Sequence, residues 1–255
     1  MSYNIAVAGK GGSGKTTVSS LVVRYLRKNG LGPVLAVDAD PNANLGESLG
    51  LSVRQTIGSI IATFNEEKIN IPPGMTKEAY LEFRLNDAVV ESKGLDLVTM
   101  GRGEGPACYC YPNLLLRKFM DIMAGNYRYI VLDNEAGMEH LSRRTTQNID
   151  ELLLVSNHSV KGIRTLARIK ELADELKLVV KRHSVILNMV PGGMDPQVKE
   201  EMTRLGIEPA AIIPLDNPVG EFDMAMNPLL DLPECRATKA VDTLMAELLQ
   251  NKVSA

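Results

Sequence analysis

Short apolar runs alternate along this chain with segments whose apolar residues recur at helical spacing. The runs are rich in β-branched residues and nearly continuous in hydrophobicity, which is typical of strands buried on both faces of a sheet. We expect strands at Asn4–Ala8, Pro33–Asp38, Leu95–Met100, Tyr129–Asp133, Glu151–Val155, Ser184–Met189 and Ala210–Pro214. The helical spacing predicts helices at Lys15–Lys28, Val53–Phe64, Pro112–Met123, Glu139–Asn148, Val160–Leu176, Pro196–Leu205 and Arg236–Gln250.

This alternation of strand and helix predicts the fold class. It favours an α/β fold with a single doubly wound, mostly parallel sheet flanked by helices. The chain has no internal repeat, no low-complexity tract and no Pro/Gly/Ser-rich linker, so we expect residues 1–255 to form one domain. Residues 65–93 are polar and fit the alternation poorly, and we expect them to form an excursion from the sheet.

Composition and charge narrow the classes of function. Apolar residues make up 45% of the chain, which is enough for a full core. No apolar run reaches the roughly 18 residues of a membrane span, and the first residues lack the basic region and cleavage site of a secretion signal. With only three cysteines, the chain is expected to be cytoplasmic. The net charge of −3 predicts no general attraction to nucleic acid or to a membrane.

One glycine-rich loop carries the strongest chemical signal. The segment from Gly9 to Thr16 reads GKGGSGKT, which matches the P-loop pattern G-x-x-x-x-G-K-[ST] between a predicted strand and a predicted helix. Its glycines allow backbone N–H groups to surround an anion, and the following helix adds its positive end. We expect Lys15 to reach the β- and γ-phosphates of ATP and the Thr16 hydroxyl to bind Mg²⁺. The predicted nucleotide-binding residues of this loop are Gly11, Gly12, Ser13, Gly14, Lys15, Thr16 and Thr17.

Lys10 makes the loop more specific. The pattern K-G-G-x-G-K-[ST]-[ST], which begins at Lys10, resembles the deviant P-loop of the MinD/ParA/nitrogenase-iron-protein family of dimeric ATPases. The resemblance implies a homodimer in which Lys10 crosses a two-fold interface to the partner's nucleotide. There it would supply charge to the transition state in the way that an arginine finger does.

Three further segments resemble this family in the same order. A strand ending in Asp38-Ala-Asp40-Pro resembles the first switch, which implies that Asp40 orients or deprotonates the attacking water and that Asp38 holds the magnesium shell or the switch. The segment YIVLDNEAG resembles the Walker B strand and second switch, which implies Mg²⁺ binding through water by Asp133 and a γ-phosphate contact from the Gly137 N–H. Two later segments, Ile186–Asn188 and Ile213–Asp216, resemble the segments that contact adenine in this family. That resemblance implies adenine binding by Asn188, Pro214, Leu215 and Asp216. The resemblance makes Lys10, Lys15 and Asp40 the expected catalytic residues.

A closely spaced cysteine pair adds a second chemistry. Cys108 and Cys110 lie in a glycine-rich loop, and residues two apart in an extended stretch point the same way. Soft thiolates suit zinc, nickel, copper(I) or an iron–sulfur cluster, and two copies of the pair across a two-fold axis would supply four ligands. The C-x-C pair and the second-switch pattern D-x-x-A-G-x-E-H-L, which begins at Asp133, resemble the CooC/AcsF group. That resemblance implies ATP-dependent insertion of nickel into carbon monoxide dehydrogenase or acetyl-CoA synthase, with zinc possible in the same site.

Other functions stay open at this point. An electron-transfer ATPase resembling the nitrogenase iron protein would take its second cysteine from just after the Walker B segment, where this chain has none, although four thiolates across a dimer could still hold a cluster. A MinD-like positioning ATPase would end in a basic amphipathic membrane helix, and a DNA-partitioning ATPase would need a larger basic patch. A plain metallochaperone would not need Lys10 or Asp40. We assign structural roles, not metal binding, to Cys235, His158 and His183, and we treat His140 as a mark of the resemblance.

Overall fold

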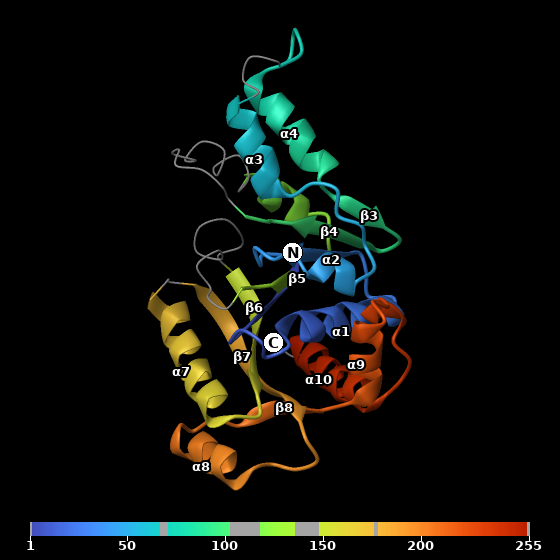
Figure 1. Cartoon of the computed structure of the whole chain (residues 1–255). Helices are drawn as coiled ribbons and strands as arrows, with labels where there is room; N and C mark the ends of the chain where they lie inside the picture. The colour runs from blue at the N-terminus through green and yellow to red at the C-terminus, as the bar shows by residue number, and fades with distance from the viewer. Residues whose placement is uncertain (1, 67–70, 103–117, 136–147, 176–177, 254–255) are drawn as a thin grey trace.

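The computed structural model describes residues 2–66, 71–102, 118–135, 148–175 and 178–253. In this part of the chain one sheet runs through the molecule, with its strands in the order β3-β4-β2-β5-β1-β6-β7-β8 (Figure 1). The strands are β1 (Tyr3–Gly9), β2 (Val34–Asp38), β3 (Val90–Ser92), β4 (Leu95–Thr99), β5 (Tyr129–Asp133), β6 (Asn148–Asn157), β7 (Val179–Val190) and β8 (Pro209–Pro214). Every pair is parallel except β3 with β4. The predicted α/β class with a mostly parallel sheet is therefore confirmed.

Helices cover both faces of this sheet. Among the described residues they are α1 (Lys15–Lys28), α2 (Leu45–Ser48), α3 (Ile57–Glu66), α4 (Lys77–Asp87), α7 (Val160–Glu175), α8 (Pro196–Arg204), α9 (Asn217–Met224) and α10 (Arg236–Val253). Residues 118–124 are also helical, and η2 (Leu229–Asp231) is a short 3-10 helix. Residues 112–117 and 139–147, which belong to two of the predicted helices, lie outside the described residues. Helices α1 and α10 lie side by side (Figure 1).

The two faces of the sheet build two apolar cores. In β1, Ile5 and Val7 face the core that contains α1 and α10, whereas Ala6 and Ala8 face the core that contains α3, α4, α7 and α8. All four side chains are buried, because a strand covered on both faces sends alternate residues into each layer. Full burial of one large aliphatic side chain contributes roughly 1.5–3 kcal/mol to the stability of the fold. The two apolar layers therefore stabilise the positions of the strand ends.

Three sequence predictions need correction. The helix expected at Val53–Phe64 begins only at Ile57, and Asn148, expected to end a helix, is the first residue of β6. The predicted excursion at residues 65–93 contains α4, but its last part is not outside the sheet, because β3 pairs with β4 at the sheet edge. The last two errors share a cause: polar residues at an edge or end of a sheet carry no hydrophobic run to mark them.

The parallel strands end at a common edge. Asp38 at the end of β2 is in register with Asp133 of β5 and with Thr99 of β4, and Val7 near the end of β1 also pairs with Asp133. The segments that follow these strands therefore meet at one edge, where open α/β sheets bind ligands. In the described part of the chain, no helix has the combination of length and hydropathy needed to cross a membrane.

Candidate functional site

The glycine-rich loop joins the end of β1 to the start of α1. Gly14 caps α1 in the left-handed region, with φ of 83°, and a Cβ there would collide with the side-chain amide of Asn188. Gly12 is also left-handed, with φ of 74°. Glycine adopts these angles without strain, so the loop shape follows from the sequence. The first turn of α1 has no acidic side chain, which leaves its N–H groups and helix dipole favourable to an anion.

The two lysines of this loop lie in different surroundings. Lys15 is buried, and its Nζ donates over 3.4 Å to the backbone oxygen of Lys10. An ammonium has three N–H groups, and this bond uses one, so Lys15 can also donate to a phosphate held by the loop. The side chain of Lys10 is exposed. The loop thus offers one inward cation and one that faces solvent.

Two hydroxyl groups tie Asp133 to α1. Thr16 Oγ1 donates to Asp133 Oδ2 over 2.6 Å, and Ser19 Oγ donates to Oδ1 over 2.9 Å. Burial raises the pKa of Asp133, while these two bonds and the charge of Lys15 oppose the rise. Hydroxyl and carboxylate oxygens are hard ligands of the kind Mg²⁺ prefers, so the donor set of Thr16 and Asp133 fits a magnesium ion. The sequence prediction missed Ser19, although its spacing of three from Thr16 places both on one helix face.

Asp38 anchors the loop that follows β2. Its buried carboxylate accepts from the backbone N–H of Asp40 over 3.1 Å and of Leu45 over 2.9 Å. Burial raises the pKa of Asp38 to about 7, with the bond from Leu45 opposing the rise and the charge of Asp133 adding to it. Both carboxylate oxygens thus hold loop backbone. Of the two predicted roles of Asp38, holding the magnesium shell or holding the switch, this geometry favours the second.

The glycine-rich loop and the loop after β2 line one cavity of about 440 Å³. Lys15 and Thr16 line it from the first loop and Asp40 from the second. Asp40 is half-buried, and its Oδ1 accepts from the backbone N–H of Asn42 over 2.8 Å. Glu135, which the sequence prediction did not include, also lines this cavity. The structure therefore brings together the residues expected at the phosphates.

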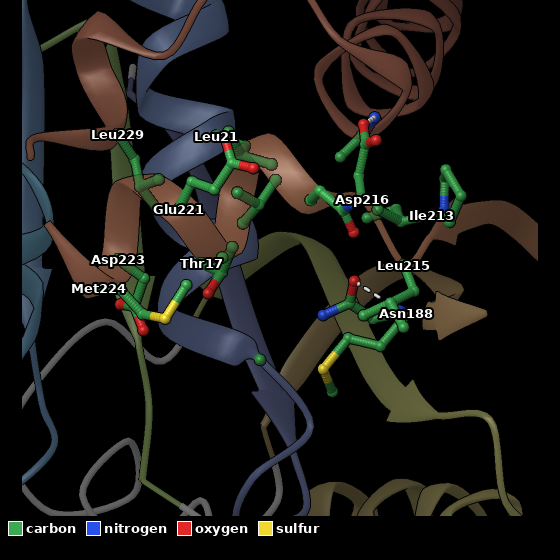
Figure 2. A pocket seen from close by; sticks show the side chains of 17 residues that line it. Thr17, Leu21, Asn188, Ile213, Leu215, Asp216, Glu221, Asp223, Met224 and Leu229 are labelled. Carbon is green, nitrogen blue, oxygen red and sulfur yellow. Dashed lines mark hydrogen bonds between the residues drawn. The ribbon is translucent and has the colours of Figure 1, made fainter. Parts of the chain in front are cut away.

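A second cavity of about 530 Å³ shares Gly14 with the first. Its walls come from α1, the end of β7, the turn after β8 and α9, and Figure 2 shows Thr17, Leu21 and Leu229 across from Asn188, Leu215 and Asp216. The cavity is largely apolar, as a pocket for a flat aromatic ring is. Because the two cavities meet at Gly14, a nucleotide can extend from one into the other.

The residues predicted to contact adenine, which include Pro214, line this second cavity, but several of their polar groups already have partners. Asn188 donates through Nδ2 to the Ser13 carbonyl over 2.9 Å and accepts at Oδ1 from the Met189 N–H over 2.9 Å. The Leu215 N–H donates to the Val190 carbonyl over 3.0 Å, which joins the turn after β8 to the end of β7 and gives that wall of the cavity a fixed shape. Asn188 therefore lines this cavity and also holds the glycine-rich loop.

Asp216 is held by the start of α10. Its Oδ2 accepts from the Ala237 N–H over 2.9 Å, and its Oδ1 accepts from Arg236 Nε over 3.3 Å. Partial burial acts to raise the pKa of Asp216, but the hydrogen bonds from Ala237, the Cys235 thiol and Arg236 outweigh it and hold the pKa below its ordinary value. No sequence motif marks Arg236 or Ala237, which is why the prediction missed both.

Several predicted residues lie outside the described part of the chain. These are Gly137 of the predicted second switch, the predicted metal-binding pair Cys108 and Cys110, and His140, which marks the resemblance. Within the described residues, no group of three or more His, Cys, Asp or Glu side chains is arranged to hold a metal ion. Cys235 is half-buried against the core that contains α1 and α10. His158 accepts from the backbone N–H of Asp195 over 2.9 Å.

Comparison with known proteins places this arrangement in a family. The model of the CobQ/CobB/MinD/ParA nucleotide binding domain matches residues 5–229. An uncharacterized ATP-binding protein of Methanocaldococcus jannaschii is 39% identical over 251 residues, which cover 97% of this chain and 99% of the relative. The carbon monoxide dehydrogenase accessory protein CooC of Rhodospirillum rubrum is 29% identical over 260 residues, 96% of each chain. Among solved structures, septum site-determining protein MinD of Pyrococcus horikoshii complexed with Mg-ADP has a TM-score of 0.70 at 21% identity, covering 100% and 99% of the two chains.

Proposed function

Since the chain belongs to the CobQ/CobB/MinD/ParA family and is an ATPase of the MinD/ParA type, we propose that it uses ATP to deliver nickel to an enzyme. The proposed client is carbon monoxide dehydrogenase or acetyl-CoA synthase. The metal is held between two copies of the chain by Cys108 and Cys110 of each. Zinc can occupy the same four-thiolate site.

The nucleotide chemistry uses the two connected cavities. We assign the phosphates to the cavity that contains Lys15 and Thr16, and the adenine to the apolar cavity that contains Asn188. Thr16 and Asp133 would hold Mg²⁺, which would supply neutralising charge at the phosphates. Asp40 orients the attacking water, and Lys10 of the partner copy supplies charge to the transition state. Gly137 offers its N–H to the γ-phosphate.

One observation supports coupling between the ATP site and the proposed metal site. The chain runs toward Cys108 from Met100, the residue after β4, and the Met100 N–H donates to the backbone oxygen of Asp38 over 2.8 Å. Asp38 in turn holds the loop that contains Asp40. The segment that enters the cysteine loop is therefore bonded to the residue that anchors the first switch.

Helix α3 restrains the same point. The Gly58 N–H donates to the Met100 carbonyl over 2.8 Å, and a Cβ on Gly58 would collide with the backbone oxygen of Arg102. A shift of the first switch on ATP binding or hydrolysis can therefore be transmitted to the start of the cysteine loop. This supports a metal site whose affinity depends on the nucleotide.

The likeness to CooC supports the choice of cargo. That relative, by its name, is an accessory protein of carbon monoxide dehydrogenase, and it covers 96% of this chain. The C-x-C pair in the sequence supplies the soft ligands that nickel delivery requires.

The test is an anaerobic nickel titration with and without ATP, read by protein mass and by thiolate charge-transfer absorption. We expect one nickel per two chains, with an affinity that changes when ATP is present. Because thiolates must be deprotonated to bind, the affinity should also fall in acid. A variant with Cys108→Ser and Cys110→Ser should lose stoichiometric nickel and zinc binding and keep ATP binding.

The matched control is Cys235→Ser, which removes the third cysteine and leaves the pair in place. This control should bind nickel like the unmodified chain. Retention of one metal per two chains by the double variant would show the assignment of the cysteine pair to be wrong. Brown protein with stoichiometric iron after anaerobic purification would instead favour an electron-transfer ATPase.

A further inference from the structure

Arg236, the first residue of α10, forms a fork between two neighbours in the turn after β8. Its Nε donates to Asp216 Oδ1 over 3.3 Å, and its NH2 group donates to the Leu215 carbonyl over 3.1 Å. The arginine side chain is 70% exposed, whereas that of Asp216 is 7% exposed. An exposed cation on the outside of the molecule therefore fixes two residues that line the apolar cavity.

A second donor to Asp216 comes from the same helix start. The Ala237 N–H donates to Oδ2 over 2.9 Å. Donors from Arg236 and Ala237 thus converge on one carboxylate in the cavity wall. Asp216 therefore holds the start of α10. It also lines the cavity, where a carboxylate could reach a purine ring.

A carboxylate in a purine pocket matters because purines differ in the groups at their Watson–Crick edges. Guanine presents N–H donors at N1 and N2, which a carboxylate can accept in a paired, charge-assisted arrangement. Adenine presents an acceptor at N1 and its amino group at position 6. A carboxylate with free oxygens therefore favours guanine, whereas one already occupied by protein donors loses that preference.

We propose that Arg236 is a positioning residue for base selectivity: by holding Asp216 and the Leu215 carbonyl against α10, it keeps the carboxylate from accepting the N–H groups of guanine. The inference rests on the placement of the purine in the apolar cavity proposed above. It makes no use of the cysteine pair, so it is independent of the metal that the protein carries.

The experiment measures kcat and KM for ATP and for GTP in Arg236→Ala and Arg236→Lys. Arg236→Ala frees Asp216 Oδ1, and we expect the kcat/KM ratio of GTP to ATP to rise roughly tenfold, which is the effect of about one charge-assisted hydrogen bond. The change should appear mainly in KM, because the γ-phosphate site is untouched. Arg236→Lys, whose single ammonium can hold Asp216 but cannot form the same fork, should restore part of the selectivity.

Lys239→Ala is the matched control, since Lys239 is a cation on the same helix whose partner is Glu234 at 2.9 Å. It should leave both KM values unchanged. Equal KM increases for ATP and GTP in Arg236→Ala would overturn the selectivity role while leaving the purine in this cavity. No change in either KM would also overturn the selectivity role, and neither result would bear on nickel binding by the cysteine pair. Thermal unfolding of each variant would confirm that it is folded.

Discussion

At the scale of single residues, the carboxylates of Asp38 and Asp133 combine burial with a shared position at the sheet edge. They end neighbouring strands in register, and both are buried at the sheet edge. Burial raises the pKa of each, and the negative charge of Asp133 raises the pKa of Asp38 further. The pair is therefore easier to ionise when a cation lies nearby, which is the condition that bound Mg²⁺ would create.

The raised pKa of Asp38 predicts how stability depends on pH without nucleotide. Its pKa is about 7 in the folded chain and 3.8 ordinarily. The proton that it holds stabilises the folded state fully below about pH 4, and this contribution is lost as the pH rises through 7. The free energy of unfolding should therefore fall by roughly 2.5 kcal/mol between pH 5 and pH 8 from this group. Asp38→Asn should reduce that fall, as measured by urea unfolding at both values.

A control carboxylate lies outside this pH window. Arg204 and Arg164 lower the pKa of Glu201 to about 2, so its contribution is present above pH 4.5 and is lost only toward pH 2. Glu201→Gln should therefore leave the difference between pH 5 and pH 8 unchanged. Asp133 and Glu151, whose pKa values are also raised by burial, should keep part of the slope in Asp38→Asn. An identical slope in Asp38→Asn and the unmodified chain would contradict the account.

At the scale of elements, two glycines of the phosphate loop differ in what a methyl group would meet. Gly14 is left-handed, and its Cβ would collide with Asn188, whereas Gly11 has open space and no positive φ. Gly14→Ala should therefore distort the loop, lower ATP affinity at least tenfold and lower the melting temperature. Gly11→Ala should leave the melting temperature unchanged within error. Calorimetric ATP titration and thermal unfolding would test both, and equal behaviour of the two variants would contradict the geometry.

The burial of individual strands and helices explains how far the sequence predicts the fold. The central strands were predicted to within a few residues, because β1, β2 and β5 are continuous apolar runs buried on both faces. Helix α4 was missed because it buries only Leu81 and Leu85 among polar neighbours. Helix α9 buries no residue completely and contains a glycine, so hydrophobic spacing gives no signal there.

The residues of the candidate site also differ in how far the sequence predicts them. A motif marks Lys15, Thr16, Asp38 and Asp133, and the structure brings these four residues to one end of the sheet. Contacts of residues that no motif marks cannot be found in this way. Arg236 reaches Asp216 across 20 positions, and the fold alone makes them neighbours. Sequence reasoning therefore named residues that line both cavities, but it did not find the contacts that fix the wall of the apolar cavity.

At the scale of the whole molecule, the exposed side chain of Lys10 next to the buried Lys15 is what a shared active site requires. If Lys10 acts on the partner's nucleotide, Lys10→Ala and Asp40→Ala should each hydrolyse ATP poorly and still bind it. A mixture of the two variants should recover activity. In a mixed dimer, the site that keeps Asp40 receives Lys10 from the other copy, whereas the second site lacks both. About half of the dimers in an equal mixture are mixed, and each has one complete site of two, so the mixture should reach about a quarter of the full rate.

The control for this mixing experiment replaces Lys10→Ala by Lys15→Ala. Lys15 lies against its own loop, with its Nζ 3.4 Å from the Lys10 carbonyl, so it acts within its own copy. In that mixture one site lacks Lys15 and the other lacks Asp40, and no activity should return. Recovery in the first mixture alone would assign Lys10 to the partner's nucleotide. Absence of recovery in the first mixture, with dimers present in ATP by analytical ultracentrifugation, would mean that Lys10 serves its own site, and the proposed coupling through a shared interface would lose its catalytic basis.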